Sequence, residues 1–144
     1  MSRRRRPLDE RGSVSVELVI IVPGLIMILG LLLAGGRIWL SRAVAADAAY
    51  SAARAASLAR SAQEAQTDGV SQGYAALDRR GLDCRERDVV VDTSGFAVAV
   101  GTPATVTSTV TCVVDLSDLL VPGLPGSMTL TGTGAAALDT YRAR

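Results

Sequence analysis

The sequence contains no histidine and no lysine, and its aromatic residues are one tryptophan, three tyrosines and one phenylalanine. Without histidine the chain lacks the commonest general base, and it also has no glycine-rich phosphate loop, nucleophile elbow or paired-cysteine motif. Two thiols cannot complete a structural zinc site without further ligands. We therefore expect no catalytic residues, no metal, no cofactor and no small-molecule substrate.

Because lysine is absent, all fifteen positive charges are arginine. The remainder of the chain after residue 12 has ten arginines against twelve acids, so it offers no persistent basic surface of the kind that nucleic acids require. No nucleic-acid partner is expected. The other five arginines lie within the first twelve residues: Arg3, Arg4, Arg5, Arg6 and Arg11.

An uncharged apolar run of nineteen residues, 18–36, follows this basic start. As a helix it would be about 28 Å long, enough to span a hydrocarbon core. The excess of arginine before the run, compared with Arg37 and Arg42 after it, favours a cytoplasmic N-terminus and an extracytoplasmic remainder. We expect a single-pass protein of the cytoplasmic (inner) membrane. A secretory signal peptide cut after Gly36 is an alternative, but its apolar core would be shorter and would not begin beside an acid.

That acid is Glu17, at the mouth of the apolar run. A carboxylate is costly to bury in hydrocarbon, so it needs a partner or a position that faces water. We interpret Glu17 as functional. The alternative is a structural role in the first turn of a helix, where the positive end of the helix dipole favours an acid.

An alanine-rich segment continues the helical pattern beyond the apolar run, and glycine and proline are absent from it until Gly69. This predicts one long helix over residues 13–66. A narrow stripe at helical spacing would pack either on the protein's own C-terminal domain or against sister helices, and the pattern does not separate the two. The stripe consists of Leu40, Val44, Ser51, Ala55, Leu58 and Ala62.

The remaining segment, 67–144, is predicted to form a small extracytoplasmic β domain, so that the fold class is α+β with a long N-terminal helix and a small antiparallel sheet. Period-two alternation predicts strands near residues 87–92, 96–100, 104–116 and 127–138. In the third strand the inward set is Val106, Ser108, Val110, Cys112 and Val114, and in the last strand Thr129, Thr131 and Thr133 share one side.

The two cysteines, Cys84 and Cys112, both lie in the part expected outside the cytoplasm, where disulfides persist. We expect them to form a structural disulfide. Closing a loop of about 28 residues would contribute roughly 3.5 kcal/mol in the chain-entropy model.

The N-terminal string RGSVSVELVIIVPGLIMIL resembles a type IV prepilin signal of the Flp and tight-adherence (Tad) kind. It has a short basic leader, a glycine, a glutamate five residues later and then the apolar helix. With the alanine-rich helix and the small β domain, the chain resembles the TadE-like pseudopilins over nearly its whole length.

This resemblance implies that residues 1–12 are a leader, that Gly12 is its last residue, and that Ser13 becomes the N-terminus after cleavage by prepilin peptidase. Glu17 would then be the fifth mature residue, which in related pilins attracts the α-amine of a neighbouring subunit. The implied function is that of a minor pilin or pseudopilin in pilus assembly, adhesion or secretion. Its expected partners are the membrane, prepilin peptidase, other pilins or pseudopilins and Tad assembly proteins. The alternative is a single-pass membrane-anchored extracytoplasmic binding module.

Overall fold

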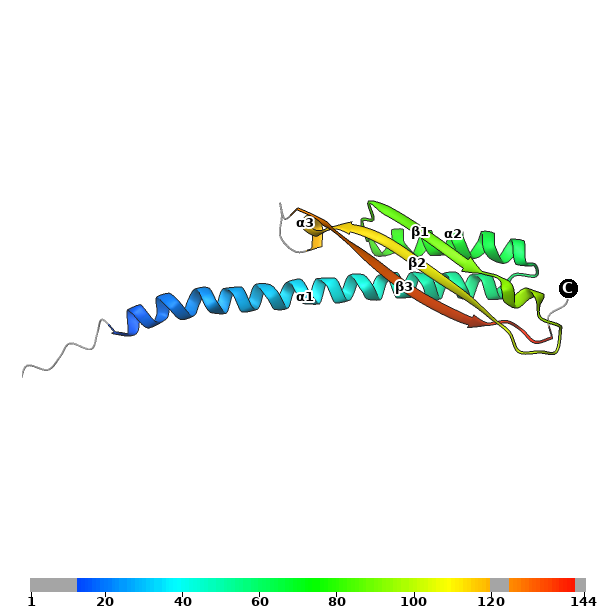
Figure 1. Ribbon diagram of the computed structural model, residues 1–144, viewed down its shortest axis with the longest axis horizontal. Coiled ribbons are helices and arrows are strands. Elements are labelled where there is room, and N and C mark those ends of the chain that lie inside the picture. Colours follow the sequence, from blue (N-terminus) through cyan, green and yellow to red (C-terminus); the bar gives the residue numbers. More distant parts are fainter. Residues whose placement is uncertain (1–12, 120–124, 142–144) are drawn as a thin grey trace, which may run out of the picture. The chain divides into compact units, whose positions relative to one another are not determined.

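The computed structural model describes residues 13–119 and 125–141, and its side chains from residue 18 to 117 and from 125 to 141. The chain divides into two compact units, Met1–Gly36 and Arg37–Arg144. The elements are α1 (Ser13–Leu58), α2 (Ala62–Arg80), β1 (Glu86–Asp92), η2 (Ser94–Ala97), β2 (Thr105–Asp115), α3 (Leu116–Leu119) and β3 (Ser127–Ala137) (Figure 1). The predicted α+β class, a long N-terminal apolar helix followed by a small antiparallel sheet, is confirmed.

The sheet of the second unit has three strands among the described residues, in the order β1, β2, β3, with each neighbouring pair antiparallel. Its inner face carries the predicted set on β2, all of which are buried. The predicted threonine row on β3 is exposed on the other face. Alternation with a period of two therefore assigned both faces correctly, because one face packs on helices and the other faces solvent.

The inner face of the sheet rests on alanines of α1, including Ala45, Ala49 and Ala52, each of which is fully buried. On β3, Gly132 lies directly against the α1 backbone at Ala45, and an added Cβ there would come closer than 3.0 Å to backbone atoms. A helix and a strand can approach so closely only where neither presents a bulky side chain.

Ser108 is the one polar member of the inward set on β2, and it is 2 % exposed. Its hydroxyl donates a hydrogen bond to the carbonyl oxygen of Ala49 in α1. A buried hydroxyl without a partner would destabilise the fold, so this bond makes the serine compatible with the core and ties β2 to the helix.

The stripe predicted on the helix was wrong. Of its members, Leu40 and Leu58 are 60 % and 77 % exposed, whereas the buried face is shifted round the helix. The predicted stripe mixed small residues with leucine and valine, whereas the face that packs on the sheet is alanine throughout, because the backbones come so close. The buried face packs on the protein's own sheet, and consists of Ala45, Ala48, Ala49, Ala52, Ala53 and Ala56.

The single helix predicted over residues 13–66 was wrong at its C-terminal end, since α1 ends at Leu58 and a second helix follows. Ser61 caps α2 by accepting a hydrogen bond from the Glu64 N–H at 3.2 Å, and the Glu64 carboxylate accepts one from the Arg60 N–H at 3.0 Å. This S-x-x-E capping pattern starts a new helix. Residues 67–80, which were expected in the β domain, therefore lie in α2.

Two glycines four residues apart let α2 lie close to its neighbours. A Cβ added at Gly69 would lie 2.9 Å from Val91 and 3.1 Å from the carbonyl oxygen of Ala52, and one added at Gly73 would lie 2.7 Å from Val89. Gly69, which we took as the limit of the helical segment, is thus a packing position within α2, and so is Gly73. They bring α2 against both α1 and β1.

The strand predicted over residues 96–100 was also wrong, because the chain turns through η2 there. The Asp92 carboxylate accepts a hydrogen bond from the Ser94 N–H at 2.9 Å, and the Phe96 N–H donates to the Thr93 carbonyl at 2.9 Å. Bonds from the backbone and the side chain of Ser94 hold the pKa of Asp92 below its usual value. Local bonds of this kind compete with strand pairing.

Replacing Gly132 by alanine should destabilise the second unit by about 1–3 kcal/mol, because the new methyl group meets helix backbone that cannot rotate away. Valine at the same position should cost more. Urea unfolding of the detergent-solubilised full chain, followed by circular dichroism, measures both. Thr131→Ala, on the exposed side of the same strand, is the matched control, and equal unfolding midpoints for Gly132→Ala and the control would contradict the close approach.

Candidate functional site

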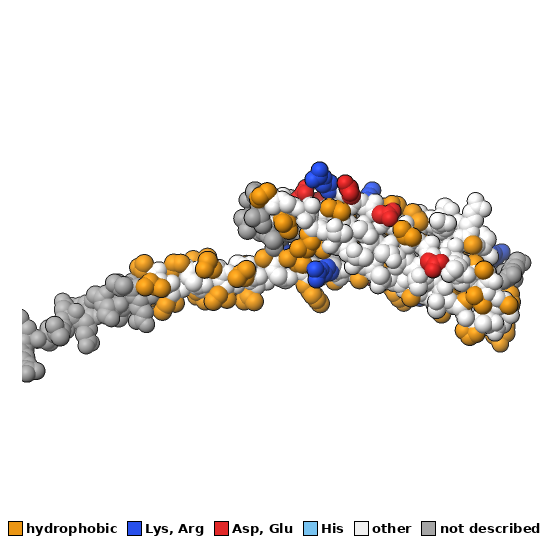
Figure 2. Space-filling view, viewed as in Figure 1, with side chains coloured by type: hydrophobic (Ala, Val, Ile, Leu, Met, Phe, Trp, Pro, Cys, Tyr) orange, Lys and Arg blue, Asp and Glu red, His pale blue; other side chains and the backbone are white. Residues whose placement is uncertain are grey.

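The apolar part of α1 in the first unit, residues 18–36, is exposed at nearly every position. Figure 2 shows hydrophobic side chains along this part of the helix and no charged side chain on the face in view. Within the described residues, α1 is the one helix long and apolar enough to cross a membrane. A long helix with an apolar and exposed surface is consistent with a single-pass membrane anchor.

The residues predicted to form the processing and assembly site lie at the start of this helix. Ser13 is the first residue of α1, and Glu17 belongs to the helix four residues later. The first turn of α1 holds no acid and Glu17 follows directly after it, and both the assembly role and the helix-dipole role of Glu17 stay predictions. Gly12 and the side chain of Glu17 lie outside what the structure describes.

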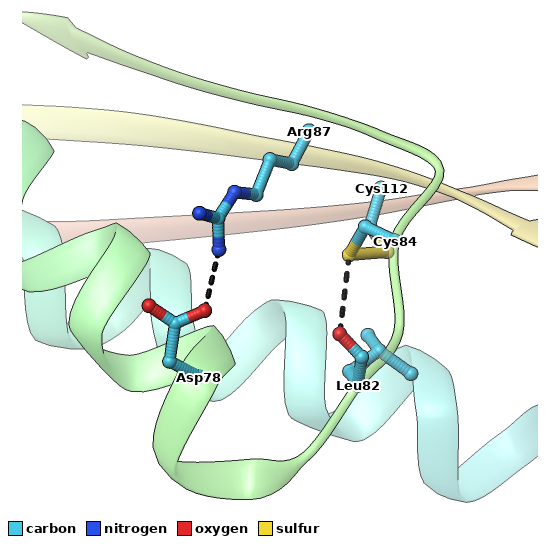
Figure 3. A network of polar contacts seen from close by, with 5 residues as sticks. All are labelled: Asp78, Leu82, Cys84, Arg87 and Cys112. Atoms are coloured by element: carbon cyan, nitrogen blue, oxygen red, sulfur yellow. Dashed lines mark hydrogen bonds and ion pairs between the residues drawn. A yellow bond between two sulfur atoms is a disulfide. The ribbon is translucent and has the colours of Figure 1, made fainter.

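The two cysteines are joined in the second unit. Cys84 and Cys112 form a disulfide with a Cα–Cα distance of 5.3 Å (Figure 3), which confirms the predicted bridge. Cys112 lies on the buried face of β2, and Cys84 lies in the connection between α2 and β1. The Cys84 Sγ lies 3.6 Å from the carbonyl oxygen of Leu82, which is a contact only, because a disulfide sulfur has no proton to donate. The bridge fixes the connection to the centre of the sheet.

Charged side chains near the disulfide hold α2 to β1. Arg87 pairs with Asp78 (Figure 3), and its guanidinium lies 5.1 Å from the centroid of the Tyr74 ring. Arg85 lies 3.9 Å from Asp115. All three arginine and aspartate pairs that the structure describes are substantially exposed, so each contributes little to stability.

Arg87 also lines a surface pocket with Glu86, Asp88, Thr111 and Val113. No group of three or more His, Cys, Asp or Glu side chains that could hold a metal ion occurs in the part of the chain that the structure describes. The features that point to function are therefore the anchor helix with its N-terminal Gly-Ser and Glu17, and the disulfide-stabilised β domain that follows it.

The geometry defines a class of protein with one N-terminal apolar helix and a small α+β domain stapled by a disulfide. Residues 12–54 match the family model described as TadE-like protein, which is the family that the sequence resembles. The match indicates a protein associated with Tad pili. No curated protein and no solved structure matches the chain.

Removing the disulfide should lower the free energy of unfolding by about 3–4 kcal/mol, because the open chain regains the entropy of a 28-residue loop. Urea unfolding of the full chain carrying both Cys84→Ala and Cys112→Ala measures this loss. Reductant should destabilise the wild type to a similar extent and leave the double variant unchanged. A non-reducing mass measurement that finds two free thiols in exported protein would contradict the bridge.

Proposed function

We propose that this protein is a minor pilin or pseudopilin of a Tad system, processed by prepilin peptidase and assembled through its N-terminal helix. It is a structural component and not an enzyme. The observation that carries the proposal is the TadE-like match over residues 12–54, which includes Gly12, Ser13 and Glu17 and enters the alanine-rich part of α1. The uncovered apolar surface of residues 18–36 supports it, because such a helix needs either lipid or other helices around it.

Cleavage between Gly12 and Ser13 would create an α-amine at the N-terminus of α1. The carboxylate of Glu17, on the next turn, would attract the amine of a neighbouring subunit as the helices associate. In surroundings of low dielectric constant such an attraction is strong, and a misplaced subunit would leave the carboxylate buried without a partner. The pair would therefore specify the axial register of the helices as well as hold them together.

The proposed topology places the N-terminus in the cytoplasm and the second unit outside it. The arginines that precede residue 18 support this orientation through the positive-inside rule. The disulfide supports it independently, since structural disulfides persist in oxidising compartments. In this position the β domain is displayed at the membrane surface or on an extracellular fibre, where it serves assembly, adhesion or secretion.

The first test is the N-terminus of the mature protein in its native host. We expect N-terminal sequencing to give Ser13, and a peptidase-deficient strain to retain the leader. A chain that still begins near Met1 would favour the anchored binding module. A chain cut after Gly36 would show a signal peptide, and either result would remove the pilin proposal.

The second test replaces Glu17 by glutamine, which keeps the size of the side chain and removes its charge. Cleavage should continue, while incorporation into a fibre or membrane complex should fall by about tenfold or more, as expected for the loss of a buried ionic partner. Immunoblots of sheared surface fractions and of crosslinked membranes measure incorporation. Ser15→Ala, in the same turn, is the control, and wild-type incorporation of the Glu17→Gln protein would refute the register role.

A further inference from the structure

The part of α1 that begins the second unit combines large exposed apolar side chains with arginines. Trp39 is 71 % exposed, and Leu40 beside it is also largely exposed. Arg37 and Arg42 flank this pair, and among the side chains that the structure describes no acid lies within 4.0 Å of either guanidinium. Exposed tryptophan next to arginine is typical of the boundary between a bilayer and water, where the indole and the long arginine stem are each half apolar.

The strand β3 points towards this same end of the second unit. Gly132 lies against Ala45, and Gly134 lies against Ala49, one turn further along α1. Following β3 backwards from Gly134 therefore leads towards the start of α1 in this unit. Figure 1 shows α3 and the beginning of β3 together at that end of the sheet.

The strand is long enough to reach the arginines. From Gly132 back to Ser127 the strand extends about 17 Å at 3.4 Å per residue. From Ala45 back to Arg37 the helix rises about 12 Å at 1.5 Å per residue. The strand segment is longer than the helix segment. Even if β3 crosses α1 obliquely, the start of β3 therefore reaches as far back along α1 as Arg37, the first residue of α1 in this unit.

The described residues at this end of the hairpin are mostly uncharged. The Leu116 N–H donates a hydrogen bond to the Gly126 carbonyl at 3.0 Å, which closes the end of the β2 and β3 ladder. Leu116 is partly exposed and Pro125 is exposed. Leu116 and Pro125 thus present partly exposed and exposed apolar side chains at the end of the sheet that points towards the start of α1 in this unit.

We propose that this surface, the Trp39 rim, lies in the headgroup layer of the bilayer, so that the β domain contacts the lipid in addition to being tethered to it. The rim consists of Arg37, Trp39, Leu40, Arg42, Leu116 and Pro125. The inference rests on the proposed membrane anchoring of residues 18–36.

Two observations favour lipid as the occupant of the rim. The rim is continuous with the apolar run, since Trp39 is three residues, or about 4.5 Å of helix, beyond Gly36. Arg37 and Arg42, which have no acid within 4.0 Å among the described side chains, are complementary in charge to lipid phosphates. The hairpin end then adds an apolar contact beside them, as interfacial segments do.

The experiment uses the full chain in vesicles of phosphatidylglycerol and phosphatidylethanolamine, and exploits the single tryptophan of the sequence. Trp39 fluorescence should be strongly quenched by lipids brominated near the glycerol end of the acyl chain and weakly by lipids brominated near the bilayer centre. Pro125→Trp in a Trp39→Phe background reports the hairpin in the same way. Val90→Trp in that background is the control, because Val90 is exposed on the outer face of β1, away from the rim.

We expect Pro125→Trp to be quenched by the shallow brominated lipid and Val90→Trp only by aqueous acrylamide. If both respond only to acrylamide, or both equally to lipid, the rim proposal is wrong. Shielding of Pro125→Trp from lipid and acrylamide alike would mean that a protein covers the rim, which would also overturn the lipid assignment. Retention in the membrane after alkaline carbonate extraction tests the anchor separately, and circular dichroism with a non-reducing mass confirms that each variant is folded.

Discussion

The contact on which the second unit depends is the close approach of α1 to the sheet. Alanines cover the buried face of the helix, and Gly132 and Gly134 on β3 present no side chain to it. Such packing excludes bulky residues, and so explains a core with few aromatic side chains. Small side chains each bury little area, so the contact must be extended and closely fitted to stabilise the unit. The disulfide and the second helix compensate for the limited apolar area, as in other small domains.

The same helix meets two different requirements along its length. Its first part is apolar and exposed at nearly every described position from 18 to 36, whereas its second part buries one alanine face and exposes polar residues such as Asp47 and Arg54. Large aliphatic residues suit a lipid or helix-bundle environment, and alanine suits contact with a sheet. The change in composition near residue 37 therefore separates the apolar segment from the scaffold of a folded domain, without a break in the helix.

Local patterns predicted those parts of the fold that depend on neighbouring residues in one element. The alternation on β2 identified its buried face, and the positions of Cys84 and Cys112 were sufficient to expect the bridge. The break after Leu58 was missed because the residues around it are good helix formers. The capping pair Ser61 and Glu64 starts a second helix there. The buried stripe was missed because, in an alanine-rich helix, small residues recur at helical spacing on more than one face, and only the contact with the sheet selects one of these faces. At the candidate site, Gly12, Ser13 and Glu17 were predicted from a linear motif alone, and their roles stay predictions.

The disulfide joins the segment that follows α2 to the central strand of the sheet. Cys112 packs in a cluster with Ala45 of α1, Val114 and Leu130, and Met128 at the start of β3 contacts the same cluster. Cys84 fixes the end of α2 to that point through a covalent bond, so the helix, the hairpin and the second helix meet at one place near the entry of α1 into the unit. Because this cluster is small, the covalent bond adds stability that its packing alone does not supply.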